Sequence, residues 1–143
     1  MVIVRTSTRF RREATAVPSA RAFVRHALRS AGASTAAVDS LVLAAAEACN
    51  NAVLHATGRD FTVGVTVDTC RAVVVVSDEG PGFRPPARRS MPEVQATGRR
   101  GLALMDALVE RVDVSSGPAG TMVVLGVSLV AHDERPVPLT TDR

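Results

Sequence analysis

The spacing of hydrophobic residues changes along the chain, and each change predicts a different element. Residues 2–10 alternate weakly and are rich in Val and Thr, which predicts a strand at the edge of a sheet. Apolar residues then recur at helical spacing between Pro18, which suits a first helical turn, and Gly32, which suits a helix end. Ser34 is a plausible N-cap for a second helix that continues to about residue 56. This second helix also carries Leu43 and Leu54 opposite its main apolar face, so we expect it to be covered on more than one side.

After Gly58 the pattern takes the period of strands. Residues 61–67 alternate apolar and polar, and residues 72–77 (AVVVVS) are almost continuously apolar, which predicts a β-hairpin with a heavily buried second strand. Residues 102–108 return to the helical period, and two last strands are expected at 112–115 and 121–130. The order β-α-α-β-β-loop-α-β-β predicts an α+β fold, a two-layer sandwich with helices on one face of a mainly antiparallel sheet.

Composition restricts the class of protein. The 143 residues, 46% of them hydrophobic, are typical of one folded domain. No run of about 18 apolar residues predicts a membrane span, and the N-terminus does not resemble a signal peptide, so we expect a cytoplasmic protein without a membrane partner. Cys49 and Cys70 are too few for a disulfide framework and form no CxxC zinc pair; both are expected to be reduced, half-buried small side chains.

The charged residues are distributed unevenly. The chain contains Arg but no Lys. A Walker-type phosphate loop requires Lys, so this kind of nucleotide site is excluded. Residues 84–100 carry five Arg and one Glu, a local charge of +4, so the rest of the chain sums to −1. With four Phe and neither Trp nor Tyr, the composition does not favour a nucleic-acid binder.

Three polar groups of residues interrupt the scaffold. Glu47, Asn51 and His55 lie four residues apart within an apolar helix, DEGPGF (78–83) follows the most apolar strand, and GRRGL (98–102) precedes a helix. Taken singly, they are typical of a solvated helix face, a turn and a loop. Together they offer a carboxylate that can accept a hydrogen bond from an exocyclic amine, and glycines that let a flat ring approach the main chain. They also offer free N–H groups that can bind phosphate, and a magnesium ligand. These are the contacts that an adenine nucleotide needs.

The same residues resemble a known family. EACNNAVLHA is similar to the N-box of the GHKL ATPase superfamily, DEGPGF to its adenine-reading box, GRRGLAL to its glycine-rich phosphate box, and Gly120-Thr121 to a strand motif that supports the adenine reader. The family's Bergerat fold would cover residues 8–130 as a histidine-kinase-like ATPase domain, followed by a mobile tail, 131–143. The short length and the form ExxxNAxxHA resemble the anti-sigma-factor serine/threonine kinases of the RsbW and SpoIIAB type.

The resemblance implies a role for each matching residue. Glu47 corresponds to the general base, Asn51 to the Mg²⁺ ligand and Asp78 to the adenine reader. The remaining nucleotide-binding positions would be Gly80, Gly82, Gly98, Arg100, Gly101, Leu102 and Thr121. His55 matches the family position but receives no chemistry, since a packed or capping role suits it better. Arg99 departs from the family pattern, in which a glycine is often found. Residues 84–97 would form a lid over ATP.

By resemblance, the chain is expected to be an ATP- and Mg²⁺-dependent protein serine/threonine kinase. It would phosphorylate an anti-anti-sigma antagonist of the STAS type, sequester a sigma factor and thereby regulate transcription, acting as a homodimer. An alternative is a nucleotide-gated protein-binding switch without kinase activity; Glu47 favours the kinase, because a Gln or Ala there would favour the switch. A third hypothesis, direct nucleic-acid binding through the Arg-rich segment, is disfavoured by the missing aromatic residues.

Overall fold

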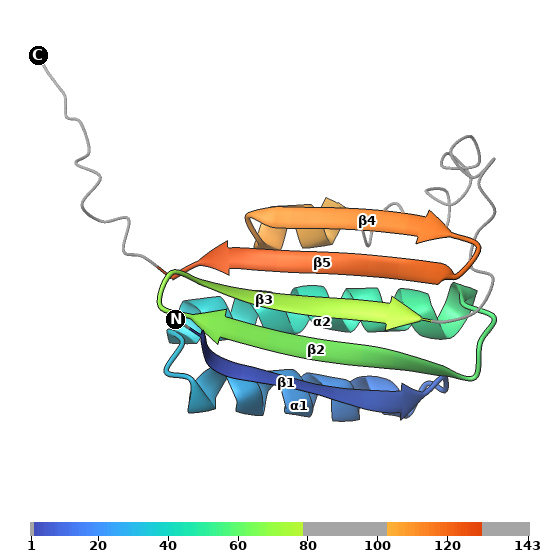
Figure 1. Cartoon of the computed structure of the whole chain (residues 1–143), viewed down its shortest axis with the longest axis horizontal. Coiled ribbons are helices and arrows are strands. Elements are labelled where there is room, and N and C mark those ends of the chain that lie inside the picture. Colours follow the sequence, from blue (N-terminus) through green and yellow to red (C-terminus); the bar gives the residue numbers. More distant parts are fainter. Residues whose placement is uncertain (1, 79–102, 130–143) are drawn as a thin grey trace, which may run out of the picture.

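The computed structural model describes residues 2–78 and 103–129 (Figure 1). Within them, five strands form one sheet in the order β1-β2-β3-β5-β4, and all four pairings are antiparallel. The strands are β1 (Val2–Arg11), β2 (Asp60–Asp68), β3 (Arg71–Asp78), β4 (Arg111–Gly117) and β5 (Gly120–Ser128). The predicted edge strand, the β2–β3 hairpin and the two last strands are therefore confirmed.

Two helices cover one face of this sheet. Helix α1 (Ala16–Ser30) contacts β1 and β2, and helix α2 (Thr35–His55) contacts mainly β3 and β5 (Figure 1). The helix ends follow the sequence signals: the Ser34 hydroxyl accepts from the Ala37 N–H at 3.1 Å, and Gly32 has φ +82° directly after the C-cap of α1. Residues 103–108 are also helical. The predicted α+β sandwich is confirmed.

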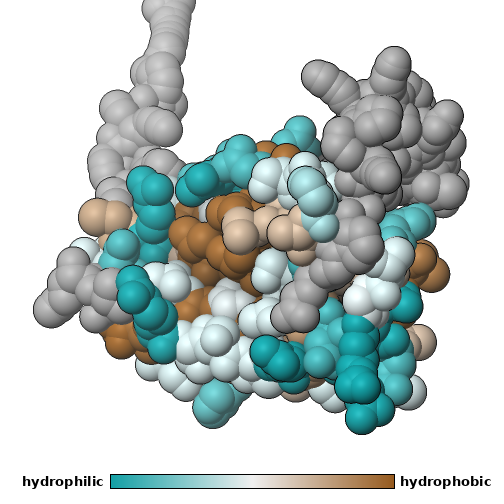
Figure 2. All heavy atoms as spheres, turned by 45° about the vertical axis from the view of Figure 1, so that its right-hand side comes forward, coloured by the Kyte–Doolittle hydropathy of each residue, from teal (hydrophilic) through white to brown (hydrophobic). Residues whose placement is uncertain are grey.

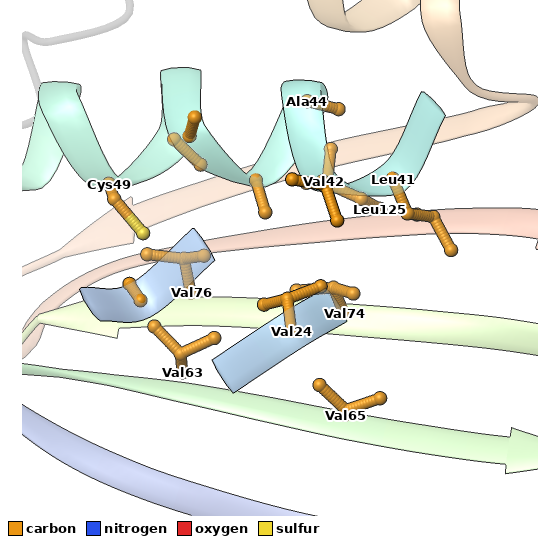
Figure 3. Close-up of a cluster of buried hydrophobic side chains, with 14 of the residues drawn as sticks. Val24, Leu41, Val42, Ala44, Cys49, Val63, Val65, Val74, Val76 and Leu125 are labelled. Carbon is orange, nitrogen blue, oxygen red and sulfur yellow. The ribbon is translucent and has the colours of Figure 1, made fainter. Parts of the chain in front are cut away.

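The core lies between the helices and the sheet. Along β2 every second residue, from Phe61 to Val67, is buried, and the same alternation places Val74 and Val76 of β3 on the core face. Side chains of α2, among them Leu41 and Cys49, point towards these strands (Figure 3). Burial on one face only explains the period-2 sequence pattern of β2. β3 is less buried than its almost continuously apolar sequence predicts, because Val73 and Val75 on its other face are only half-buried.

The opposite face of the sheet has no helix over it among the described residues. By register, Val73 and Val75 of β3 share this face with Val124 and Met122 of β5, and Met122 is 44% exposed. Figure 2 views this face obliquely and shows apolar surface near its centre with hydrophilic side chains around it. We call it the open face of the sheet.

Two expectations about side-chain burial were wrong. Leu43 is 51% exposed and Leu54 is 71% exposed, so the outward side of α2 is not covered at these positions. Cys70 is exposed in the β2–β3 turn, whereas Cys49 is fully buried in the core, where burial raises the pKa of its thiol to about 12. Cys49 is therefore a neutral, packed side chain at physiological pH.

Helix α2 is long and apolar enough to cross a membrane by length and composition, with a mean hydropathy of 1.2 over its most apolar window. Half of that window is buried inside the molecule, and its apolar side packs on β3 and β5. The core helix of a globular protein has these same properties, so they are weak support for a membrane span.

Arg12 links the end of β1 to the end of α2. Its Nη1 donates to the carbonyl of Val53 at 2.8 Å, and its Nε donates to the carbonyl of Gly58 at 2.6 Å. The last carbonyls of a helix lack partners within the helix, and a cation there also interacts favourably with the helix dipole. Arg12 therefore fixes the C-terminal end of α2 against the sheet.

We predict that Arg12→Ala lowers the free energy of unfolding by about 1–3 kcal/mol, because it leaves two part-buried carbonyls without their charged donor. Urea unfolding measures this change. The matched control is Arg11→Ala, which removes an exposed neighbouring arginine and should stay within about 0.5 kcal/mol of wild type. Equal effects of the two substitutions would contradict the linking role of Arg12.

Candidate nucleotide site

The Glu47, Asn51 and His55 side chains form one row along α2. All three are half-buried and lie at the border between the buried side of the helix and its exposed side. On one side of this row Ala44 and Ala48 are buried; on the other, Asn50 and the two exposed leucines face solvent. The spacing of four residues predicted the shared row, and the structure places it at the edge of the core.

Glu47 and Asn51 make no hydrogen bond or ion pair with any residue that the structure describes. A carboxylate and an amide that are partly withdrawn from water lose free energy unless a polar partner compensates them. Among the described residues, nothing occupies the oxygen atoms of this pair, which lies on a partly sheltered surface. His55 is the last residue of α2, where a basic ring suits the helix dipole, in agreement with a packing or capping role.

Asp78 lies at the end of β3, between the strands β2 and β5. Its Oδ1 accepts a hydrogen bond from the main-chain N–H of Thr121, with an N–O distance of 3.2 Å. This bond fixes the orientation of the carboxylate at the end of this central strand, where Asp78 is half-buried. A carboxylate held in this way presents a defined acceptor, as recognition of an exocyclic amine requires.

Gly120 is what allows β5 to approach Asp78 so closely. A Cβ at position 120 would lie 2.0 Å from the carbonyl oxygen of Asp78 and 3.2 Å from its Oδ1, and the backbone there has φ +136°. Both the space and the dihedral angle restrict this position to glycine. Gly120 was part of the motif recognised in the sequence, but no role was assigned to it, because the contact joins segments far apart in the chain.

Thr121 supports Asp78 through its main chain, whereas the resemblance left the supporting atom unspecified. Its hydroxyl lies 3.1 Å from Oγ of Ser116 on β4. The side chain of Thr121 thus joins β5 to β4 while its N–H holds the carboxylate on β3. Three strands are tied together at this corner of the sheet.

These parts meet at one end of the molecule. Helix α2 and strand β3 both end there, and β5 begins there (Figure 1). Asn51 lies in the last turns of α2, on the same end as Asp78 and Thr121. The other predicted site positions lie outside the described residues: Gly80, Gly82, Gly98, Arg100, Gly101 and Leu102, together with the Arg-rich segment 84–97 and the tail 131–143.

The oxygen atoms of Glu47 and Asn51 are of the chemical type that binds magnesium. Among the described residues, no group of three His, Cys, Asp or Glu side chains could hold a metal ion by itself. In nucleotide sites Mg²⁺ is commonly bound by one or two protein oxygens together with phosphates and water. The Asn51 amide oxygen, with Glu47 one helical turn away, offers ligands of that kind.

A family model for the histidine kinase-like ATPase domain matches residues 10–127. The chain belongs to this family. The resemblance to GHKL ATPases seen in the motifs is thereby confirmed, and the held carboxylate at the end of β3 agrees with it.

A solved structure shares the fold of this histidine kinase-like ATPase domain. The crystal structure of the RsbU and RsbW domains of Rv1364c from Mycobacterium tuberculosis matches with a TM-score of 0.66 and 22% identity, over 88% of this chain and 32% of that one. The present chain thus spans less than half of the matched chain, and at this identity the likeness shows the fold. No curated protein sequence matches significantly.

We predict that Gly120→Ala lowers the free energy of unfolding by at least about 2 kcal/mol. The new methyl group would collide with the main chain of Asp78, and alanine rarely adopts the φ angle that the backbone has at this position. Thermal or urea unfolding measures the loss. Gly117→Ala is the matched control: it lies at the other end of the same turn, has no atom within 4 Å of the added Cβ and should stay near wild-type stability. A stable Gly120→Ala protein would mean that β5 does not hold Asp78 as described.

Proposed function

We propose that the chain is an ATP-dependent protein serine/threonine kinase of the anti-sigma-factor type. It would bind ATP with Mg²⁺, transfer the γ-phosphoryl group to an anti-anti-sigma antagonist of the STAS class, and sequester a sigma factor. The observation that carries the nucleotide part is the carboxylate of Asp78, held by the Thr121 N–H at the end of a central strand. Membership of an ATPase family supports the same reading.

The roles of the site residues follow from their chemistry. Asp78 accepts from the adenine amino group with its carboxylate, whose orientation the Thr121 N–H helps to fix. Asn51 supplies an amide oxygen to Mg²⁺, which neutralises charge on the phosphates when it is bound. Glu47, one turn earlier on α2, is the candidate base, because a carboxylate without a partner among the described residues is free to accept a proton.

The transfer step itself needs a hydroxyl group from the antagonist protein. Glu47 takes the proton of a serine or threonine hydroxyl, the hydroxyl oxygen forms the new bond to the γ-phosphorus, and the bond from that phosphorus to the β–γ bridging oxygen breaks, releasing ADP. Helix α2 would contribute both groups: Asn51 positions the phosphoryl donor ATP through Mg²⁺, and Glu47 holds the proton. A cytoplasmic location, transcription regulation and a homodimer also form part of this proposal. The similar structure contains an RsbW domain, which supports the anti-sigma-factor part of the proposal.

We predict that two substitutions on α2 impair different steps, one the binding of ATP and the other phosphoryl transfer. Asn51→Ala should weaken Mg²⁺-dependent ATP binding by at least about tenfold, because it removes the metal ligand. Glu47→Gln should keep ATP affinity within about threefold yet slow phosphoryl transfer by about 10²–10⁴-fold, because an amide cannot serve as the base. Calorimetry with ATP, and transfer from γ-labelled ATP to a STAS-domain protein that co-purifies with the chain, measure the two effects.

Asn50→Ala is the matched control, since Asn50 is exposed on the same helix beside the row. It should change neither ATP binding nor transfer. Wild-type transfer rates for Glu47→Gln would overturn the catalytic assignment. ATP binding by the wild type without transfer to any partner protein would instead favour the alternative, a nucleotide-gated binding switch.

A further inference from the structure

The two helices of the fold end in different ways. Helix α1 has a local glycine cap: Gly32 adopts φ +82°, and its N–H donates to the carbonyl of Arg29 at 2.9 Å. Helix α2 has no such cap, although the structure describes the whole of its C-terminal end and the residues that lead to β2. Its C-cap, Ala56, is extended, with φ −73° and ψ 161°, and no described N–H after Ala56 donates to a carbonyl of the helix. The last carbonyls of α2 therefore need partners from elsewhere.

Arg12, directly after β1, supplies these partners from a distant part of the chain. Its Nη1 donates to the carbonyl of Val53 in the last turn of α2, and its Nε donates to the carbonyl of Gly58 in the connection to β2. The main-chain N–H of Arg12 also donates to the carbonyl of Arg59 at 2.9 Å. Because the plane of the guanidinium group fixes the directions of its N–H groups, the helix end and the connection are held relative to each other.

The end that Arg12 holds is the part of α2 that carries Asn51. Asn51 lies four residues before His55, the last residue of the helix, whereas Glu47 lies eight residues before it. Residues near a helix end open locally at a low cost in free energy, and residues farther inside open rarely. The loss of Arg12 should therefore disturb the main chain at Asn51 more than at Glu47.

The contacts of Arg12 favour an indirect role over direct binding of phosphate. Its side chain is half-buried, and it forms no ion pair with any residue that the structure describes. A phosphate contact through Nε or Nη1 would break a charge-assisted bond to a part-buried carbonyl, which is costly. We therefore expect Arg12 to act on a nucleotide through the end of α2.

We propose that Arg12 is a positioning residue for the magnesium ligand Asn51. By closing the C-terminal end of α2, it keeps the last turns helical in the nucleotide-free chain, so that the main chain of Asn51 is in place before Mg²⁺ and ATP bind. Without Arg12, binding of the metal must also order the last turn, and that cost weakens the affinity. The inference rests on the proposed function, because that function assigns Asn51 to magnesium.

The test measures ATP affinity of the full-length chain by calorimetry, once with Mg²⁺ and once with EDTA. We call the ratio of the two affinities the magnesium gain. R12A should lower the magnesium gain at least about fivefold and leave the affinity in EDTA within about twofold of wild type. R12K keeps the charge but not the planar group, so it should lose less of the gain than R12A, and it carries the test if R12A does not fold.

Hydrogen exchange of the nucleotide-free chain gives a second measurement, which needs neither metal nor ATP. In R12A the amides of residues 52–56 should exchange at least about tenfold faster than in wild type, because the last turn opens more often. The amides around Glu47 should exchange at an unchanged rate. Unchanged exchange at residues 52–56 would contradict the role of Arg12 in closing the helix.

Two matched controls separate positioning from stability and from charge. S34A removes the cap at the other end of the same helix, about 25 Å from Asn51, and R11A removes the same charge from the exposed neighbouring residue. Both should keep the magnesium gain within about twofold of wild type. A loss in S34A equal to that in R12A would overturn the proposal, because the gain would then follow stability alone. An equal loss in R11A would overturn it in favour of a charge effect.

The wild-type chain distinguishes failure of this inference from failure of the proposed function. If wild type shows a magnesium gain that R12A retains in full, Arg12 does not position the metal ligand, and the proposed nucleotide function still holds. If wild type binds no ATP, or binds it equally well with Mg²⁺ and with EDTA, the proposed function is contradicted and the positioning role of Arg12 with it.

Discussion

The close approach of β5 to the end of β3 is the contact on which the candidate site depends. Asp78 keeps its carboxylate in a fixed orientation only because the Thr121 N–H reaches its Oδ1, and that reach exists only because position 120 has no Cβ. β3 lies between β2 and β5. A shift of β5 at position 120 would therefore change both the orientation of the Asp78 carboxylate and the pairing of β5 with β3. The candidate site and the stability of the fold therefore depend on the same contact between β3 and β5.

Helix α2 serves two purposes along its length. Its sheet-facing side fills the core, and its border carries Glu47 and Asn51 without partners among the described residues. Arg12 fixes the C-terminal end of this helix through the Val53 carbonyl of its last turn and the Gly58 carbonyl just beyond it. Anchoring the end of the helix fixes where the main chain of both polar residues lies relative to the sheet.

Much of this fold could be predicted from local patterns. The strand β2 could be predicted because its buried and exposed faces give an alternating sequence, and β3 because of its short apolar run. Ser34 and Gly32 mark helix ends by local backbone chemistry. Contacts between distant segments could not be predicted in that way: Asp78 and Thr121 are 43 positions apart, and Arg12 reaches carbonyls 41 and 46 positions away. Leu43 and Leu54 were misjudged because apolarity alone does not show whether another segment covers a residue.

The most direct test of the central claim compares ATP with GTP by calorimetry in the presence of Mg²⁺. Guanine presents a carbonyl oxygen where adenine presents an amino group, so a held carboxylate at Asp78 should reject it. The account predicts that the chain binds ATP at least about a hundredfold more tightly than GTP. Equal affinities for the two nucleotides, or no binding of ATP, would contradict the assignment of Asp78 and the nucleotide site built around it.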